Sequence, residues 1–457
     1  MFSAPRFIAV DDKKEHLDAI ITSFHRMGES CVGILFTPEE AVDPSFFRGV
    51  RCIFMDLHLV SGQKGTSHNG DFGRIQTILE DSISSTGGPF MLVMWTAYPE
   101  LRGELVDYLE RNIRPEMVHA KPLAVLSLAK DKFIKDLSGG DLTDRFALRD
   151  AIKAAVLESP QLAALLGWEA DVSRAAGATL ASLLSLVPSE KRTAEGFSKE
   201  LDKILSRLVR EAVGSAHVNA SPRAAVSTAL APILADRILH QDVEDGAREN
   251  WEKAVTLHLD KKLEPASLLE AAGINRMLHL ALPSSESLSA TNWGAVIAWP
   301  FEWTDDKLAE YTDMSRTQML GGEFKVRSAE LGRCQPVLVR VGAACDYAQN
   351  RMGPITYLFG MIIPVDAARQ KKNNKDGIEG DVLKPSDAVW ESPIFDFPGA
   401  GVASRLYVHI RFPQTHLPKK TSEWKVLCRL REQLLTHLIS AASSYVARPG
   451  IVQLFSA

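Results

Sequence analysis

The sequence predicts a five-stranded parallel α/β domain at the amino terminus, followed by an all-helical region and an α+β domain. Three observations lead to this prediction. Short apolar runs alternate with helix-sized segments over the first 137 residues, as in a parallel sheet with helices on both faces. The chain then becomes rich in alanine and leucine at helical spacing, and later regains β-branched and aromatic runs. The expected domains are residues 1–138, 139–288 and 289–457.

The expected strands of the first domain are the apolar runs at residues 6–10, 31–36, 51–55, 90–95 and 115–120. Helices are expected between them, at residues 14–27, from residue 37, and at 70–83, 100–112 and 123–137, with a linker at 138–141. The carboxyl ends of parallel strands lie at one edge of a sheet, where reactive groups gather. The polar residues that follow four of the strands should therefore converge, and they are Asp11, Asp12, Asp56, Thr96 and Lys121.

The charges of this set predict a metal site. Three carboxylates held close together repel one another, and a bound cation relieves that repulsion. Oxygen ligands suit a hard divalent ion such as Mg²⁺, which keeps several of its waters. With the ion bound, Asp56 could act as a nucleophile toward a phosphoryl group whose oxygens contact Lys121 and Thr96. The product would be an acyl phosphate on Asp56.

These residues, in this order, resemble the receiver domain of two-component response regulators over residues 5–137. The motifs are Val-Asp-Asp at 10–12, Met-Asp-Leu at 55–57, Thr-Ala at 96–97 and Lys-Pro at 121–122. The resemblance implies a flavodoxin-like fold, Asp56 as the phosphoacceptor, and Mg²⁺ held by Asp11, Asp12 and Asp56. It also implies that Thr96 and Lys121 sense the phosphoryl group, and that a histidine kinase is the partner.

The segment departs from that family in two places. The loop after the acceptor, residues 59–70, is several residues longer than in the family, which would change how partners dock there. The position three before the lysine is aromatic in many receivers and takes part in their switch, but here it is Val118. Signalling through an aromatic side chain at that position is therefore not expected.

The composition of the whole chain limits the classes of function. Its 457 residues carry 52 Lys and Arg against 57 Asp and Glu, a net charge of −5, so no general attraction to nucleic acid is expected. The five cysteines are scattered without a Cys-x-x-Cys pair, which favours reduced thiols in the cytoplasm over disulfides or a zinc site. No signal peptide or transmembrane run is expected, so the protein should be cytoplasmic and act away from membranes.

The sequence after residue 138 does not indicate a specific activity. Single histidines of the helical region are interpreted as ordinary core or surface residues. The α+β domain is expected to have strands at 296–299, 337–341, 356–363 and 406–410, and a last helix over 422–446 with leucines on one face. Cys345 follows a strand, and a catalytic thiol there would need His409 or His416 brought close by the fold. No independent catalytic motif is present.

The main hypothesis is a phosphoacceptor that works through protein contacts or as a phosphate buffer, without separate enzyme activity. Large receiver proteins of this layout are similar to components of bacterial anti-phage phosphorelays of the Detocs type, which would add an effector or phosphatase protein to the kinase as partners. A homodimer is a further possibility. Two alternatives remain open: a receiver that controls a hydrolytic α+β domain, and an inert receiver-like scaffold.

Overall fold

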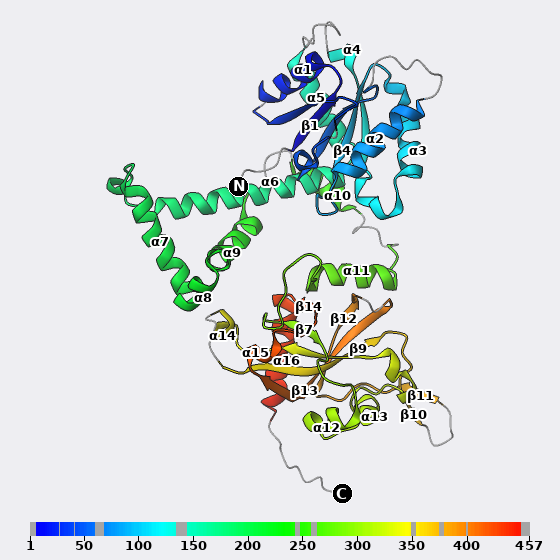
Figure 1. Ribbon diagram of the computed structural model, residues 1–457, viewed down its shortest axis with the longest axis vertical. Helices are drawn as coiled ribbons and strands as arrows, with labels where there is room; N and C mark the ends of the chain where they lie inside the picture. Colours follow the sequence, from blue (N-terminus) through cyan, green and yellow to red (C-terminus); the bar gives the residue numbers. More distant parts are fainter. Residues whose placement is uncertain are drawn as a thin grey trace. The chain divides into compact units, whose positions relative to one another are not determined.

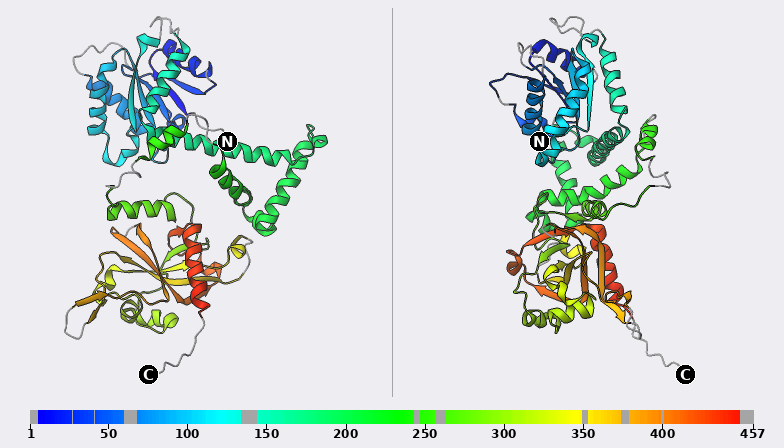
Figure 2. Two further views of the ribbon diagram at one scale, coloured as in Figure 1. Left: turned by 180° about the vertical axis from the view of Figure 1, so that it is seen from behind. Right: turned by 90° about the vertical axis from the view of Figure 1, so that its right-hand side faces the viewer.

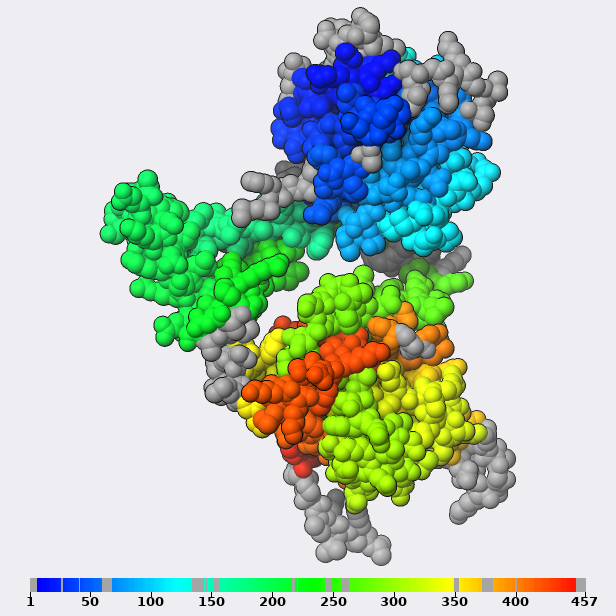
Figure 3. Space-filling view, in the orientation of Figure 1, coloured from blue at the N-terminus to red at the C-terminus, as the bar shows by residue number. Residues whose placement is uncertain are grey.

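The computed structural model divides the chain into two compact units (Figures 1 and 3). The first comprises Met1–Ala178 and Asp236–Lys261, and the second Thr179–Ala235 and Lys262–Ala457. The structure describes residues 6–26, 28–40, 42–59, 68–133, 144–242, 247–256, 263–348, 353–373, 379–398 and 401–448. The expected linker at 138–141 and most of the long loop at 59–70 lie outside these residues.

The first unit is built on a parallel sheet with the strand order β2-β1-β3-β4-β5. The strands are β1 (Phe7–Asp11), β2 (Cys31–Leu35), β3 (Cys52–Asp56), β4 (Met91–Thr96) and β5 (Ala124–Ala129). Every residue of β3 and β4 is buried, as expected for apolar runs covered on both faces. At the edge of the sheet, only Cys31 of β2 is buried, and its other residues alternate between half-buried and exposed.

Helices cover both faces of this sheet (Figure 2). On one face, α2 (Asn69–Ser82) and α3 (Arg102–Asn112) contribute Phe72, Ile75 and Leu105 to a core with β3 and β4. On the other face lie α1 (Lys14–Arg26), the short α4 (Lys130–Phe133), α5 (Arg145–Leu157) and the start of α6 (Pro160–Ser185).

Residues beyond the expected boundary at 138 belong to the first core. Leu148 of α5 and Leu162 of α6 are fully buried in the same cluster as Phe54 and Trp95 of the sheet. The sheet face would otherwise expose these aromatic side chains to water. The first unit therefore continues into the region that the sequence assigned to a separate helical domain.

The expected middle helices are present but do not form one unit. After α6 come α7 (Gly196–Val213), α8 (Ser215–Ala220), α9 (Pro222–His240) and α10 (Ala247–Ala254). A small core of Val209, Val213, Ala225 and Ala229 joins α7 to α9. The division between the units falls within α6, and α10 is grouped with the first unit. Within the described residues, no helix is both long and apolar enough to cross a membrane.

The second unit contains an antiparallel sheet with the strand order β12-β13-β9-β8-β7-β14-β6. These strands are β6 (Leu280–Ala281), β7 (Ala295–Ala298), β8 (Gln335–Arg340), β9 (Ile355–Pro364), β12 (Val389–Asp396), β13 (Ala403–His416) and β14 (Val426–Leu430). A separate pair is formed by β10 (Lys371–Asn373) and β11 (Glu379–Val382). Because α11 (Leu268–His279) packs on β12 and leads directly into β6, this domain begins about twenty residues before the expected boundary at 289.

Different helices cover the two faces of this sheet (Figure 2). On one face, α16 (Glu432–Val446) buries Leu434, Leu435 and Leu438 against the strands. On the other, Leu308 of α12 (Asp305–Thr312) and Met319, after α13 (Arg316–Gln318), pack on Phe359. Two further short α-helices are α14 (Ala344–Ala348) and α15 (Pro418–Thr421).

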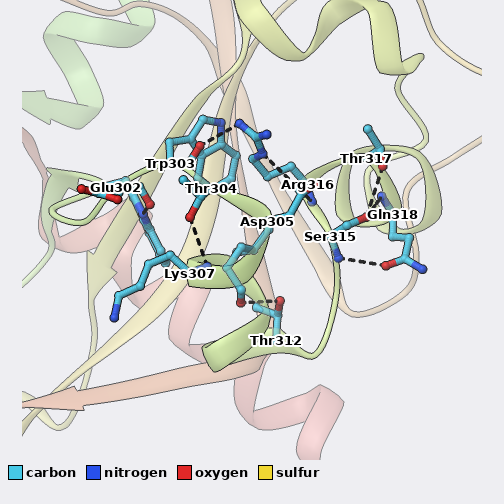
Figure 4. A network of polar contacts seen from close by, with 12 residues as sticks. Glu302, Trp303, Thr304, Asp305, Lys307, Thr312, Ser315, Arg316, Thr317 and Gln318 are labelled. Atoms are coloured by element: carbon cyan, nitrogen blue, oxygen red, sulfur yellow. Dashed lines mark hydrogen bonds and ion pairs between the residues drawn. The ribbon is translucent and has the colours of Figure 1, made fainter.

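A local polar network fixes α12 and α13 (Figure 4). Thr304 and Ser315 cap the two helices, each accepting a hydrogen bond from a backbone N–H of the first turn. Arg316 joins them, since its guanidinium donates to Asp305 Oδ1 at 2.8 Å and to the carbonyl oxygen of Trp303 at 2.7 Å. These groups satisfy one another, so the network explains the placement of the helices without a ligand.

The structure corrects four expected elements. Among the described residues no helix begins at residue 37, and a 3-10 helix follows only at Pro44–Phe47. The helix expected over 123–137 is also wrong, because its first part is strand β5 and only Lys130–Phe133 of the described residues is helical. Residues 115–120 form a 3-10 helix (Pro115–Ala120), and the fifth strand is Ala124–Ala129 instead. The expected helix over 422–446 is also wrong in its first part, because Val426–Leu430 is strand β14 and the helix begins at Glu432. At residues 115–129 and 422–446 a short apolar run fitted either a strand or a helix, and periodicity alone cannot separate the two.

Candidate functional site

The carboxyl edge of the parallel sheet gathers a cluster of charged and polar side chains. Asp11 is the last residue of β1 and Asp56 the last residue of β3, and Thr96 ends β4. Asp12 follows Asp11 directly. Because β1, β3 and β4 are neighbours in the sheet, their ends lie side by side, and the three acids come close together there, as the sequence predicted.

The lysine of the cluster is Lys130 and not Lys121. Lys130 follows the last residue of β5, and its Nζ lies 2.7 Å from Asp11 Oδ2 and 2.8 Å from Asp56 Oδ2. Its side chain is only 5% exposed. One ammonium therefore bridges two carboxylates at the strand ends.

The assignment of Lys121 to the site is thus corrected. Lys121 is exposed and donates a hydrogen bond from Nζ to the carbonyl oxygen of Glu110 at 3.0 Å. The error follows from the shifted fifth strand. Since residues 115–120 form a 3-10 helix, Lys121 precedes β5, whereas Lys130 follows it.

Sequence reasoning also missed His16. This residue of α1 is buried, and its Nδ1 lies 3.1 Å from Nζ of Lys130 and 3.5 Å from Oδ1 of Asp11. A lysine ammonium has no acceptor, so Nδ1 accepts the hydrogen bond from Lys130. The only sequence signal was its place on the first helix, five residues after Asp11, where it faces the sheet with Leu17 and Ile20.

Backbone groups orient two of the polar side chains. The N–H of Lys13 donates to Asp11 Oδ1 at 2.9 Å, and the N–H of Tyr98 donates to Thr96 Oγ1 at 3.1 Å. The loops that follow the strands thus hold both side chains in place. Thr96 is 1% exposed, so its side chain is buried at the end of β4.

The burial of Asp56 affects the pKa of its carboxyl group. Asp56 is 6% exposed, and this burial raises the pKa of its carboxyl above the usual value. The Lys130 ammonium acts against that rise, and the negative charge of Asp11 adds to it. Asp56 is therefore a carboxylate whose charge is costly to maintain without further positive charge nearby.

The three acids have the geometry of a cation site. One oxygen from each of Asp11, Asp12 and Asp56 can be chosen so that all lie within 4.8 Å of one another. Three carboxylates with one ammonium leave two negative charges when all the groups are ionised. The donor atoms are all carboxylate oxygens, the ligands that hard divalent cations prefer. A buried acidic triad that could bind a metal ion is therefore present.

The second unit does not assemble the catalytic thiol considered as an alternative. Cys345 lies exposed on α14. His409 is fully buried in β13 and pairs through Nε2 with Glu323 at 2.9 Å, while His416 packs against Trp424 and Phe301. Neither histidine contacts Cys345 among the described residues.

Comparisons with protein-family models, curated proteins and solved structures gave no match to the chain. The functional argument therefore depends on the geometry of the chain itself.

Proposed function

We propose that the first unit accepts a phosphoryl group on Asp56 in the presence of Mg²⁺, in the manner of a response-regulator receiver domain. The observation that carries the proposal is the joint position of Asp11, Asp12, Asp56, Thr96 and Lys130 at the carboxyl ends of four adjacent parallel strands. A buried acid at a strand end is common, but a nucleophile, a cation site and a buried ammonium together suit phosphoryl transfer.

Asp56, Lys130 and Thr96 would each have a separate role in the phosphoryl transfer. A carboxylate oxygen of Asp56 attacks the phosphorus of a phosphohistidine, the new P–O bond forms as the P–N bond breaks, and the released imidazole nitrogen takes up a proton. Lys130 moves its ion pair from the Asp56 carboxylate to a phosphoryl oxygen, and Thr96 donates its hydroxyl hydrogen to another. Bound Mg²⁺, held by Asp11, Asp12 and Asp56, would supply positive charge to the phosphoryl oxygens.

The biological setting is part of the proposal. A histidine kinase would be the phosphodonor, and the second unit or a separate effector or phosphatase protein would receive the signal or draw on the stored phosphoryl group. An anti-phage phosphorelay of the Detocs type accommodates such a protein. The support is the similarity of the first unit to a receiver domain together with the absence of a Cys345–histidine pair among the described residues of the second.

The test uses the full chain with acetyl phosphate as phosphodonor and intact-mass spectrometry as readout. We expect one added phosphoryl group that requires Mg²⁺ and is removed by hydroxylamine, as an acyl phosphate should be. Asp56→Asn should abolish it, whereas Asp18→Asn, which changes an exposed acid of the same unit, should not. Equal labelling of the Asp56→Asn variant would overturn the acceptor assignment. No Mg²⁺ binding by the wild-type chain would favour an inert scaffold.

A further inference from the structure

A second cluster of metal-ligating side chains lies beside the acidic site and takes no part in the proposed phosphoryl transfer. It consists of His58, two residues after the end of β3, and of His68 and Asp71 at the start of α2. One ligand atom from each can be chosen so that all three lie within 4.8 Å of one another. These residues come from both ends of the loop that joins β3 to α2.

The contacts of this cluster position its donor atoms. Nδ1 of His58 lies 2.9 Å from Oδ2 of Asp71, and the other oxygen of Asp71 accepts a hydrogen bond from Arg74 at 3.1 Å. Arg74 therefore fixes the carboxylate with one oxygen toward His58. The ring of Tyr98 stands edge-on to His58, with centroids 5.2 Å apart, and restricts the imidazole from another side.

The side chain of His68 does not cap the helix that it precedes. It occupies the N-cap position of α2, where Ser, Thr, Asp and Asn are preferred because their side chains accept backbone hydrogen bonds. The side chain of His68 makes no such capping bond. Instead its ring lies beside that of His58, with centroids 5.6 Å apart.

We propose that His58, His68 and Asp71 bind a divalent transition metal ion, with zinc as the best fit. Two imidazoles and one carboxylate form a known zinc donor set that leaves a fourth position for water or another ligand. Ligands on a tetrahedral zinc ion lie about 3.3 Å apart. The separation of 2.9 Å between His58 Nδ1 and Asp71 Oδ2 is close to that value. Rotation of the partly exposed His68 ring would bring its ligating nitrogen to a similar distance.

The two clusters differ in the ion that they select. Imidazole nitrogen favours zinc and its neighbours in the first transition row, whereas a set of carboxylate oxygens favours Mg²⁺. Arg74 also offsets the charge of Asp71, which further disfavours a hard ion that depends on carboxylate charge. The zinc site connects the carboxyl end of β3 to the amino end of α2, and it stands independently of phosphorylation at Asp56.

The test measures zinc affinity of the metal-stripped full chain by competition with a chromophoric chelator, with excess Mg²⁺ to occupy the acidic site. We expect one zinc ion per chain. His68→Gln and Asp71→Asn should each weaken binding by at least about tenfold, since loss even of an outer-shell partner costs about 10–100-fold in metal affinity. His25→Gln, which changes an exposed histidine of α1, should leave the affinity unchanged.

Further measurements distinguish loss of metal binding from misfolding of a variant. Co²⁺ added to the wild-type chain should give the visible absorption of a low-symmetry site with nitrogen ligands, and Zn²⁺ should displace it. Melting curves monitored by circular dichroism verify that each variant is folded. Failure of the wild-type chain to compete with the chelator would show that His58 and Asp71 form only a structural hydrogen bond. Unchanged zinc affinity in folded His68→Gln and Asp71→Asn would place the ion elsewhere and overturn the proposal.

Discussion

Lys130 is the residue on which the charge balance of the acidic site depends. Its ammonium contacts two carboxylates in a region where Asp11 is fully buried. Removal of one partner from a buried ion pair leaves uncompensated charge and costs about 3–5 kcal/mol. The same charge would be needed to bind a phosphoryl oxygen, so stability and phosphoryl transfer should both respond to this side chain.

The substitution Lys130→Met should lower the free energy of unfolding by about 3 kcal/mol in the absence of Mg²⁺, and added Mg²⁺ should recover part of the loss. Labelling by acetyl phosphate should fall at least tenfold. Urea unfolding and intact-mass spectrometry measure the two effects. Lys121→Met is the matched control, because Lys121 makes one exposed hydrogen bond. An equal effect of both substitutions would mean that Lys130 does not serve the site.

His409 makes the stability of the second unit depend on pH. Burial lowers the pKa of His409 below its usual value of 6.5, although the hydrogen bond with Glu323 acts in the opposite direction. The unfolded chain therefore binds a proton at a higher pH than the folded chain does. The contribution of His409 to the free energy of unfolding is complete above pH 6.5. It declines as the pH falls toward the lower pKa that His409 has in the folded chain.

We expect the second unit to unfold at lower urea concentration as the pH is reduced below 6.5, and the decline to be shallower in His409→Gln. Burial and Lys420 also lower the pKa of His416, so His416 should account for a part of the decline that remains. Urea titrations at a series of pH values measure the slope. A slope that is identical in wild type and His409→Gln would contradict the assignment.

At the scale of elements, the start of α6 is predicted to stabilise the first unit. Leu162 is fully buried in the core beneath the sheet, whereas Leu165, three residues later on the same helix, is 52% exposed. Leu162→Ala should cost about 3 kcal/mol through lost burial and the cavity left behind. Leu165→Ala should cost no more than about 0.5 kcal/mol. Thermal unfolding of the two variants gives the comparison, and similar melting temperatures would show that α6 does not complete this core.

The sequence was a good guide to elements wherever a fully buried strand ended in an acid. The four residues before Asp11 and the four before Asp56 are all apolar, and a central parallel strand is the simplest structure for such a run. The fifth strand was missed because Ala124–Ala129 includes Ser127 and only part of it is buried, so its apolar signal is weak. Lys121 was chosen in place of Lys130 because it follows the run at 115–120 and forms, with Pro122, the Lys-Pro pair that resembles the receiver motif.

Contacts between distant segments were beyond sequence reasoning. Leu427 and Leu430 fitted the apolar face of the following helix, but in the structure they lie in β14, between β7 and β6. His16 and Lys130 are far apart in the chain, and only the fold, in which α1 packs on β1 and β2 and Lys130 follows β5, lets their side chains meet. The pairing of His58 with Asp71 likewise required the position of α2 relative to β3. Such contacts depend on tertiary packing, which local periodicity does not encode.

At the scale of the whole molecule, the two units have separate hydrophobic cores. The clusters around β3 and β4 lie in the first unit, and those around β9 and β13 lie in the second. Units with their own cores are expected to unfold in separate steps. A ligand that binds one folded unit stabilises that unit by mass action, by about 2.7 kcal/mol at a concentration one hundred times its dissociation constant.

Differential scanning calorimetry of the full chain should therefore show two transitions, of which Mg²⁺ raises only the one that belongs to the first unit. The variant Leu162→Ala identifies that transition, because it should lower the same one. In Asp56→Asn the shift caused by Mg²⁺ should be much reduced, since a neutral amide replaces one of three carboxylates in the acidic triad. A single transition that moves as a whole with Mg²⁺ would mean that the two units unfold cooperatively. A Mg²⁺ shift confined to the second transition would place the cation outside the acidic triad.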